Sequence, residues 1–256
     1  MYRPPDRKAP PVLFSRGTSE WIVRVDQKQK RLAELRLSGD EKQRLDRWVE
    51  IEFVYSTLIL EGADVSRQKV ARVASYAPDS GAVAASEQAV MAPLASMRKI
   101  TMLAFDKGKS AELTPEVLLQ IQSAPGAGFR RTAGEITRTM TPPAPEHLPA
   151  LLENACQWHT SESFGELNPV EQAAIVLLRL IDMQPFEQAN ERTALVASSL
   201  FTMRSELPPI IIVPEMHPAY HNALDEGVRM NTKPMVELIA EAVGRSIEAI
   251  LKQAKK

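Results

Sequence analysis

"DMQPFEQANERTALVASSL", residues Asp182 to Leu200, is the stretch that decides the fold of this chain. A proline and a phenylalanine come shortly before an asparagine and an arginine, and a run of small and apolar residues follows them. The run predicts a helix, and a turn that leads into a helix N-terminus is a common place for proteins to hold phosphate groups. A glutamine, however, stands where a catalytic base would be useful, and a glutamate stands where an anion would need room. The stretch is therefore compatible with a working, a reworked or a lost active site.

The composition is that of an ordinary soluble globular protein. The chain has 256 residues, 44% of them hydrophobic, which is enough for one large domain or for one domain with an added helical part. The formal net charge of -1 lacks the basic excess of a dedicated nucleic-acid binder. There is no run of about 18 apolar residues and no apolar signal core at the N-terminus. We therefore expect no membrane span and a cytoplasmic location.

The single cysteine, Cys156, excludes a disulfide within the chain and argues against a cysteine-based zinc site. It lies in the helical pattern "LLENACQWH", with no basic cluster beside it in the sequence. We therefore expect a small buried side chain and not a reactive thiol.

Composition and apolar spacing divide the chain into three parts. Residues 1–16 hold two PP pairs and predict an extended arm, which in one hypothesis pairs two chains into a homo-oligomer. Residues 17–110 predict a series of helices, in which Pro93 predicts a kink or a break. Residues 111–256 predict a helical core, within which residues 125–147 are rich in glycine and proline and predict a loop with a short hairpin.

Two helix ends are marked clearly. In the core, Asn168 is a good cap, with Pro169 at the first helical position and Glu171 at the third. Upstream, the helical pattern that begins at Asp40 is expected to stop at Gly62.

The order of residues in "IDMQPFEQANERTALV" resembles the signature of the Fic family. That signature reads His-Pro-Phe-x-Asp/Glu-Gly/Ala-Asn-Gly/Lys-Arg, with a second arginine three residues later. Five positions match it: Pro185, Phe186, Ala189, Asn190 and Arg192. The resemblance implies a mainly α fold, a Fic-type helical bundle with a short β-hairpin flap. It also implies the transfer of AMP from ATP to a protein hydroxyl, with Mg²⁺.

A second motif lies far upstream. "TLILEG", Thr57 to Gly62, resembles the inhibitory helix motif Ser/Thr-x-x-x-Glu-Gly/Asn, whose glutamate points into the nucleotide site in family members that carry it before the core. The resemblance makes Glu61 the inhibitory residue and covers residues 45–250. It also implies that Phe129 to Ile136 form a flap that holds a protein segment by strand addition.

Four motif positions depart from the family, and each departure bears on the chemistry. Gln184 stands for the histidine base, and an amide has no usable basic nitrogen near neutral pH. Gln188 stands for the acid that binds Mg²⁺, which prefers carboxylate oxygens. Glu191 stands for a glycine and adds a negative charge where phosphate would sit, and Leu195 stands for the arginine that grips the γ-phosphate. We therefore expect no working base, no bound metal and a degenerate nucleotide site.

Several neighbouring residues keep two interpretations. Glu61 has lost its usual arginine partner, so it either pairs with Arg192 or simply belongs to a helix C-terminus. Asn190 and Arg192 either form what remains of the anion site or serve as a helix cap and a structural ion pair. Glu187 is read as a solvated surface charge, with the role of substitute metal ligand as the alternative. Leu177, where many family members have a histidine, is read as core.

Our leading hypothesis is a Fic-fold pseudoenzyme that acts as a binding or regulatory module, with a protein partner on the flap. The alternative is an active but divergent enzyme that uses a nucleotide or another phosphorylated ligand at Asn190 and Arg192. ATP and Mg²⁺ would be cofactors only in that case. A base could then come from His217 or His221, which share a helix face and would also permit a weak metal pair. Two surface histidines are the plainer interpretation.

Overall fold

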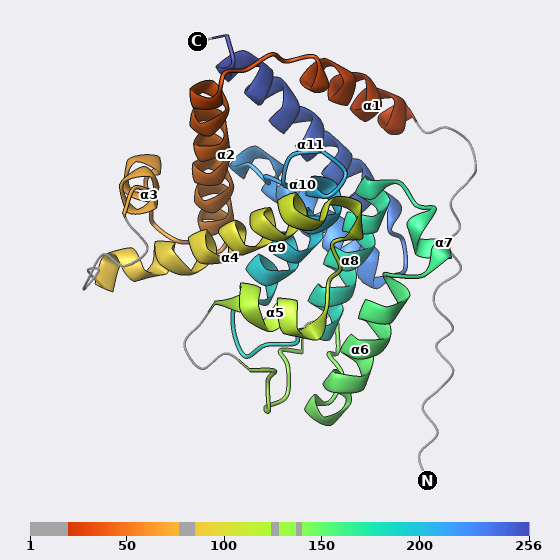
Figure 1. Ribbon diagram of the computed structural model, residues 1–256. Helices are drawn as coiled ribbons and strands as arrows, with labels where there is room; N and C mark the ends of the chain where they lie inside the picture. Colours follow the sequence, from red (N-terminus) through yellow and green to blue (C-terminus); the bar gives the residue numbers. More distant parts are fainter. Residues whose placement is uncertain (1–19, 77–84, 124–127, 137–139, 256) are drawn as a thin grey trace.

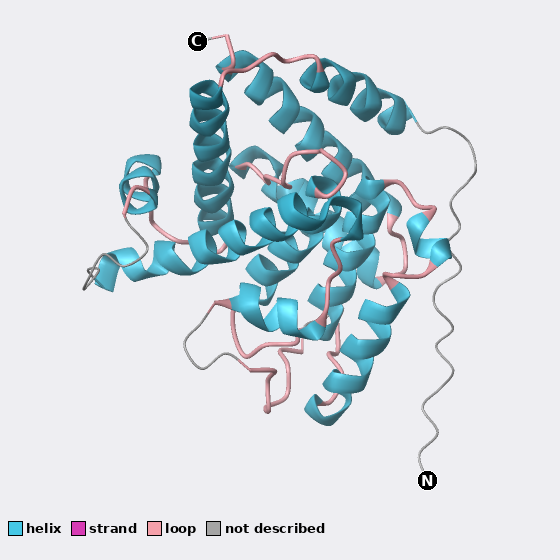
Figure 2. Ribbon diagram, in the orientation of Figure 1, coloured by secondary structure: helices cyan, strands magenta, loops and turns pink. Residues whose placement is uncertain are grey.

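The computed structural model describes residues 20–76, 85–123, 128–136 and 140–255. Within these ranges the chain is all helical, and Figure 2 shows helices and loops but no strand. The prediction of a mainly α fold is thus confirmed. The described elements are α1 (Glu20–Ala33), α2 (Gly39–Leu60), α3 (Arg67–Ala74), α4 (Ala85–Lys107), α5 (Pro115–Gln122), α6 (Leu148–Trp158), α7 (Glu162–Gly165), α8 (Pro169–Met183), α9 (Asn190–Met203), α10 (His217–Val228) and α11 (Lys233–Gln253), with short 3-10 turns at Gly108–Ser110, Pro145–His147 and Pro214–Met216.

The N-terminal helices cover one side of the molecule. α1 packs along α11, and α2 packs against α4 (Figure 1). α2 begins at a capping box, in which the Ser38 amide donates to the Glu41 carboxylate at 2.8 Å. It ends before Gly62, as predicted, and the φ of 78° at Gly62 is a conformation that glycine adopts without strain. Glu61 therefore lies at the C-cap of α2.

The centre of the molecule is the helix pair α8 and α9, which the motif joins. α8 begins at the predicted capping box, in which the Asn168 amide donates to the Glu171 carboxylate at 3.0 Å. α9 is buried at every position from Thr193 to Thr202, and it packs against α8, α4 and α5. α10 and α11 pack on α8 as well. A single hydrophobic core thus joins the N-terminal helices to the C-terminal half and fixes the start of α9.

The helix around Pro93 does not break. α4 runs without interruption from Ala85 to Lys107, and Figure 1 shows it as one continuous helix. A proline removes one backbone donor from the helix, and the packing of α4 against α2, α5 and α9 compensates for that loss.

The predicted hairpin of the flap is not seen. Residues 128–136 carry no strand, while residues 137–139 lie outside the described residues. The reason is that several backbone N–H groups of the flap bond to the motif and not to a neighbouring strand, as shown below. The predicted arm at residues 1–16 also lies outside the described residues.

Two further predictions concern single elements of the core. Cys156 is 6% exposed, and burial raises the pKa of its thiol to about 12, so the thiol stays protonated. Leu177 is fully buried in α8. No described helix combines the length and hydropathy that a membrane span requires.

Candidate functional site

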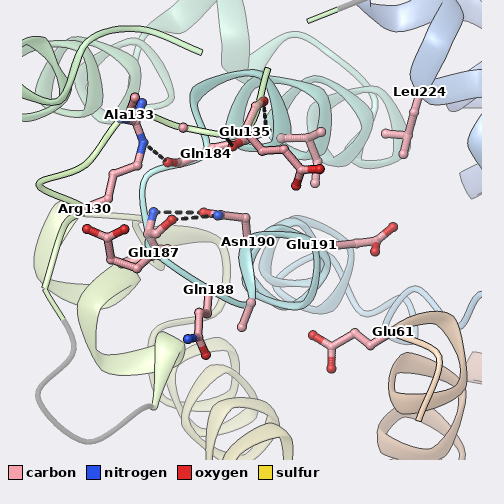
Figure 3. Close-up of a pocket in the computed structure, with 14 residues that line it drawn as sticks. Glu61, Arg130, Ala133, Glu135, Gln184, Glu187, Gln188, Asn190, Glu191 and Leu224 are labelled. Carbon is pink, nitrogen blue, oxygen red and sulfur yellow. Dashed lines mark hydrogen bonds between the residues drawn. The ribbon is translucent and has the colours of Figure 1, made fainter. Parts of the chain in front are cut away.

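A cavity of about 460 Å³ lies where the motif loop (residues 184–189), the flap (Phe129–Ile136) and the end of α2 meet (Figure 3). It brings together most of the residues that the motif analysis singled out, from segments that lie more than a hundred positions apart in the sequence. Its lining comprises Glu61, Arg130, Ala133, Gly134, Glu135, Ile181, Gln184, Phe186, Glu187, Gln188, Ala189, Asn190, Glu191 and Leu224.

The motif loop is a tight turn between two left-handed residues. Gln184 ends α8 with a φ of 42°, and Ala189 precedes α9 with a φ of 58°. The Asn190 side chain closes the turn, because its Oδ1 accepts from the Phe186 amide at 2.9 Å and its Nδ2 donates to the Phe186 carbonyl at 2.8 Å. Asn190 thus acts on the loop backbone and makes no cap bond to α9. Phe186 is 2% exposed, and its ring centroid lies 5.7 Å from that of Phe129 in the flap.

The side chain of Gln184, at the position of the family's base, is bonded to the flap. Its Oε1 accepts from the Glu135 amide at 2.8 Å, and its Nε2 donates to the Glu135 carbonyl at 3.1 Å. Both ends of the amide are therefore satisfied by one residue of the flap backbone.

Arg130 ties the flap to the motif loop and was not recognised in the sequence. Its side chain is 3% exposed, and its guanidinium donates to the carbonyl of Gln184 at 2.6 Å, of Thr132 at 2.7 Å and of Pro143 at 2.5 Å. Its own backbone amide donates to the Pro185 carbonyl at 2.9 Å. Burial lowers the pKa of Arg130, and nearby Glu187 opposes that shift.

Glu187 is an exposed surface charge, as predicted, and the structure gives its carboxylate a bonding role as well. Its Oε1 accepts from the amides of Arg131 at 2.8 Å and Thr132 at 3.2 Å, and its Oε2 accepts from the Thr132 hydroxyl at 2.5 Å. The pKa of Glu187 is lowered, first by the Thr132 hydroxyl and then by the Arg131 amide. The carboxylate is thus engaged with the flap backbone.

Glu61 is both a helix C-cap and the partner of Arg192. The Arg192 Nη1 lies 2.9 Å from the Glu61 Oε2, and the two side chains are 13% and 22% exposed. Burial raises the pKa of Glu61, while Arg192 opposes that shift. Both interpretations of Glu61 therefore hold: its backbone ends α2, and its carboxylate pairs with Arg192.

Glu191 is half-buried at the first turn of α9 and lines the cavity. Burial raises its pKa, the hydroxyl of Tyr220 and the ring of His221 oppose that shift, and the neighbouring Glu61 adds to it. The Tyr220 hydroxyl is buried, and no described group lies in hydrogen-bonding position to it. The cavity therefore holds two carboxyl groups, Glu61 and Glu191, that repel each other.

The other two motif departures differ in their placement. Gln188 lines the cavity, and in Figure 3 its side chain points away from Asn190. Leu195 is 1% exposed and lies in the core of α9, not in the cavity lining. Within the described residues, no group of three or more His, Cys, Asp or Glu side chains could hold a metal ion, and this includes the surroundings of His217 and His221.

The charges around the cavity are mostly negative. Glu61, Glu135, Glu187 and Glu191 line it, and Arg130 is the one basic residue among the described lining. The donors of Arg130 point at backbone carbonyls, and Arg192 is paired with Glu61. The lining is thus mainly acidic, and Arg130 and Arg192 are both bonded to groups of the chain itself.

Comparisons with known proteins fit this geometry. Residues 112–202 match the model of the Fic/DOC family. "Protein adenylyltransferase Fic" of Drosophila grimshawi is 29% identical over 140 residues, a match that covers 55% of this chain and 29% of that protein. The chain therefore spans less than a third of the length of this curated relative.

Solved structures show the same fold. A fragment of Fic-1 from C. elegans superimposes with a TM-score of 0.77 at 24% identity, over 92% of this chain and 72% of that one. A more distant structure, of IbpAFic2 covalently tethered to Cdc42, gives a TM-score of 0.51 at 12% identity, over 90% of this chain and 72% of that one. The family match, the curated relative and the all-helical architecture agree. Residues 112–202 therefore form a domain of the Fic/DOC type, and the chain is similar there to protein adenylyltransferases.

Proposed function

We propose that this chain is a Fic-fold binding or regulatory module that has lost the AMP-transfer reaction of its relatives. The observation that carries the proposal is the state of the cavity. Its charged lining is carboxylate except for Arg130, and Arg130 and Arg192 both have partners within the chain. A nucleotide polyphosphate needs the opposite arrangement, with free donors and few negative charges.

The first argument is the lack of a base at the family's catalytic position. Gln184 carries a neutral amide, and both of its polar ends are bonded to Glu135. It can neither accept a proton near neutral pH nor turn toward a hydroxyl without breaking those bonds. Loss of a general base alone slows such reactions by about 10²–10⁴-fold.

The second argument is that the residues do not fit a Mg²⁺–nucleotide. Gln188 supplies a neutral amide where Mg²⁺ prefers a carboxylate, and Leu195 is buried in the core where phosphate recognition would need a cation. Glu191 lines the cavity at the start of α9, where a polyphosphate would approach. Two unit charges about 4 Å apart repel by about 4 kcal/mol at the effective dielectric of a protein surface.

The flap is the proposed surface for a protein partner. The apolar side chain of Ile136, at the last described position of the flap, is 70% exposed and free to contact a partner. The distant structural relative tethered to Cdc42 supports the expectation that a Fic fold contacts a protein. In this chain the partner would be held without being modified.

Nucleotide binding provides the test. Calorimetry with ATP and Mg²⁺ is run on the natural chain and on a variant with Gln184→His, Gln188→Asp and Glu191→Gly, the three departures that line the cavity. Leu195 is left unchanged, because an arginine there would bury a charge in the core. We expect no heat of binding with the natural chain and a measurable Kd with the variant. ATP-dependent modification of any protein by the natural chain would overturn the proposal and favour the divergent-enzyme alternative.

A further inference from the structure

We propose that Gln184 closes the flap: its side-chain amide occupies the backbone N–H and C=O of Glu135, the groups through which this edge of the flap would pair with an extended protein segment. This inference rests on the proposed function, because the flap is the proposed partner surface. It concerns the regulation of that surface, whose backbone groups at Glu135 are occupied by the Gln184 side chain of the same chain.

The hydrogen bonds of Gln184 imitate those of a neighbouring strand. A strand residue that pairs in a ladder donates one N–H and accepts at one C=O on the same edge. Gln184 meets both needs of Glu135, with distances of 2.8 Å and 3.1 Å. Only one orientation of the amide satisfies both bonds, since its N–H₂ must face the carbonyl and its oxygen must face the amide. A single side chain thus takes the place of one residue of a partner strand.

The backbone below this side chain is fixed. Gln184 has left-handed angles, φ 42° and ψ 63°, which are uncommon for a residue other than glycine. Its amide donates to the Leu180 carbonyl at 3.0 Å, and its carbonyl accepts from the Arg130 guanidinium at 2.6 Å. The side chain therefore leaves the end of α8 from one defined position, and Figure 3 shows it directed toward the flap.

The flap approaches this amide so closely that a side chain at position 134 has no room. A Cβ atom at Gly134 would lie 2.8 Å from the Pro142 Cβ and 3.0 Å from the Gln184 Oε1. Real Cβ atoms essentially never come as near to another carbon as the first of these distances. The glycine thus permits the contact between the flap and Gln184.

The contact is separate from the other ties of the flap. Arg130 and Glu187 hold residues 130–132, and among the described residues Gln184 is the bonding partner of the Glu135 backbone. A rotation of the Gln184 side chain would therefore free position 135 and leave the first half of the flap in place. The adjoining cavity of about 460 Å³, which both residues line, gives an incoming segment space at this edge.

Amide hydrogen exchange, resolved by residue with NMR, tests the contact itself. The variant is Gln184→Asn, which keeps the amide, favours left-handed angles and shortens the side chain by one methylene. We expect exchange of the Glu135 amide to become about tenfold faster or more, with the amides of Arg131 and Thr132 unchanged. Gln188→Ala is the matched control, since it removes an amide from the same loop without a contact to Glu135.

A second variant separates the two halves of the flap. Glu187→Ala should speed exchange at Arg131 and Thr132 and leave Glu135 protected, the reverse of the Gln184→Asn pattern. Equal protection of the Glu135 amide in the natural chain and in Gln184→Asn would overturn the proposal. Gln184→Ala provides the same comparison without any side-chain amide at position 184.

Selection of peptides tests what the contact excludes. The probe is a phage library of random linear peptides, selected in parallel on the natural chain and on Gln184→Asn. We expect peptides that bind the variant at least tenfold more tightly, and that lose binding when Glu135→Pro removes the backbone donor in the variant. Equal binding to both chains, or no peptide on either, would overturn the claim that Gln184 shuts this edge. The calorimetric test of nucleotide binding is independent of these results, so the two proposals fail separately.

Discussion

The motif loop is held from two sides, and the two contacts differ in kind. On the flap side, Arg130, Glu187 and Gln184 bond mainly to backbone groups, and the guanidinium is almost fully buried. On the side of α2, one ion pair between Glu61 and Arg192 joins two side chains that are 131 positions apart in the sequence. The first contact depends on many short bonds to fixed groups, and the second depends on one charged pair beside water.

This difference predicts which contact stabilises the folded chain and which contact can open. Hydrogen bonds from a buried charge to backbone carbonyls are expensive to lose, because the carbonyls are left without partners. An ion pair near a surface contributes little, since the attraction is offset by the loss of hydration. We therefore expect the flap side to behave as part of the core and the α2 side as a contact that can open.

The largest expected effect is that of Arg130→Met, which keeps an unbranched apolar stem and removes every donor. We expect a loss of about 3–5 kcal/mol in the free energy of unfolding, because at least three backbone carbonyls lose their partner in a buried site. Urea unfolding followed by circular dichroism measures it. Arg131→Met is the control at the exposed neighbouring position and should change stability by less than about 0.5 kcal/mol. A loss below about 1 kcal/mol for Arg130→Met would show that the flap side is no tighter than the other.

The sequence predicted the fold well because the fold depends on local signals. The capping box at Asn168 and the stop at Gly62 were read from residue type alone, and both lie where expected. Of the kink or break predicted at Pro93, the break does not occur, because tertiary packing overrides the local cost of one lost donor. The absence of a hairpin among the described flap residues was missed for a related reason, since side chains distant in sequence take up its backbone donors.

Both contacts of the motif loop depend on an intact core behind α9, and that core contains a buried histidine, His159. Its ring is 6% exposed between Phe164 and Phe201, at centroid distances of 4.9 Å and 5.6 Å, and both ring nitrogens lack partners among the described residues. Burial, with the charges of Arg204 and Arg179, lowers its pKa from 6.5 to about 4.

The direction of the pH effect follows from that shift. Above pH 6.5 the imidazole is neutral in both the folded and the unfolded chain. Between pH 6.5 and 4 it is protonated in the unfolded chain and neutral in the folded chain. Stability should therefore fall by about 3 kcal/mol as the pH drops through this window. Thermal melts at a series of pH values measure the loss, and His159→Phe should remove it. An unchanged slope in that variant would assign the acid sensitivity to other groups.

A smaller effect is expected on the α2 side. A double-mutant cycle with Glu61→Gln and Arg192→Met should give a coupling of about 1 kcal/mol. Because burial raises the pKa of Glu61 in spite of Arg192, the ionised form is the costly one, and stability from this group is lost as the pH rises through its folded pKa. Arg192→Met should therefore destabilise more than Glu61→Gln, since it leaves a half-buried carboxylate unpaired. Equal losses for the two single variants would contradict this account.

The candidate site was less predictable than the fold. The motif identified Gln184, Gln188 and Glu191 as cavity residues, and it also named Leu195, which the structure places in the core. No sequence signal pointed to Arg130 or to the bonding role of Glu187. Both act through hydrogen bonds to backbone groups across the loop. Every residue type carries the same backbone groups, so the sequence does not reveal such partners.

The smallest expected effect is that of Gly134→Ala, and it separates the two halves of the flap side. The added methyl group would overlap Pro142 and press on the Gln184 Oε1, at 2.8 Å and 3.0 Å. Because the flap lies at the surface, it can relieve the overlap by moving outward. The free energy of unfolding should then change by less than about 0.5 kcal/mol, while the bonds between Gln184 and Glu135 lengthen. Faster exchange of the Glu135 amide with an unchanged melting temperature would show that the outer flap opens independently of the part held by Arg130.

Gly128→Ala, where an added methyl group has no atom within 4 Å, should change neither quantity. A fall in melting temperature as large as that of Arg130→Met would mean that the flap is one rigid unit, and the distinction between its halves would have to be abandoned.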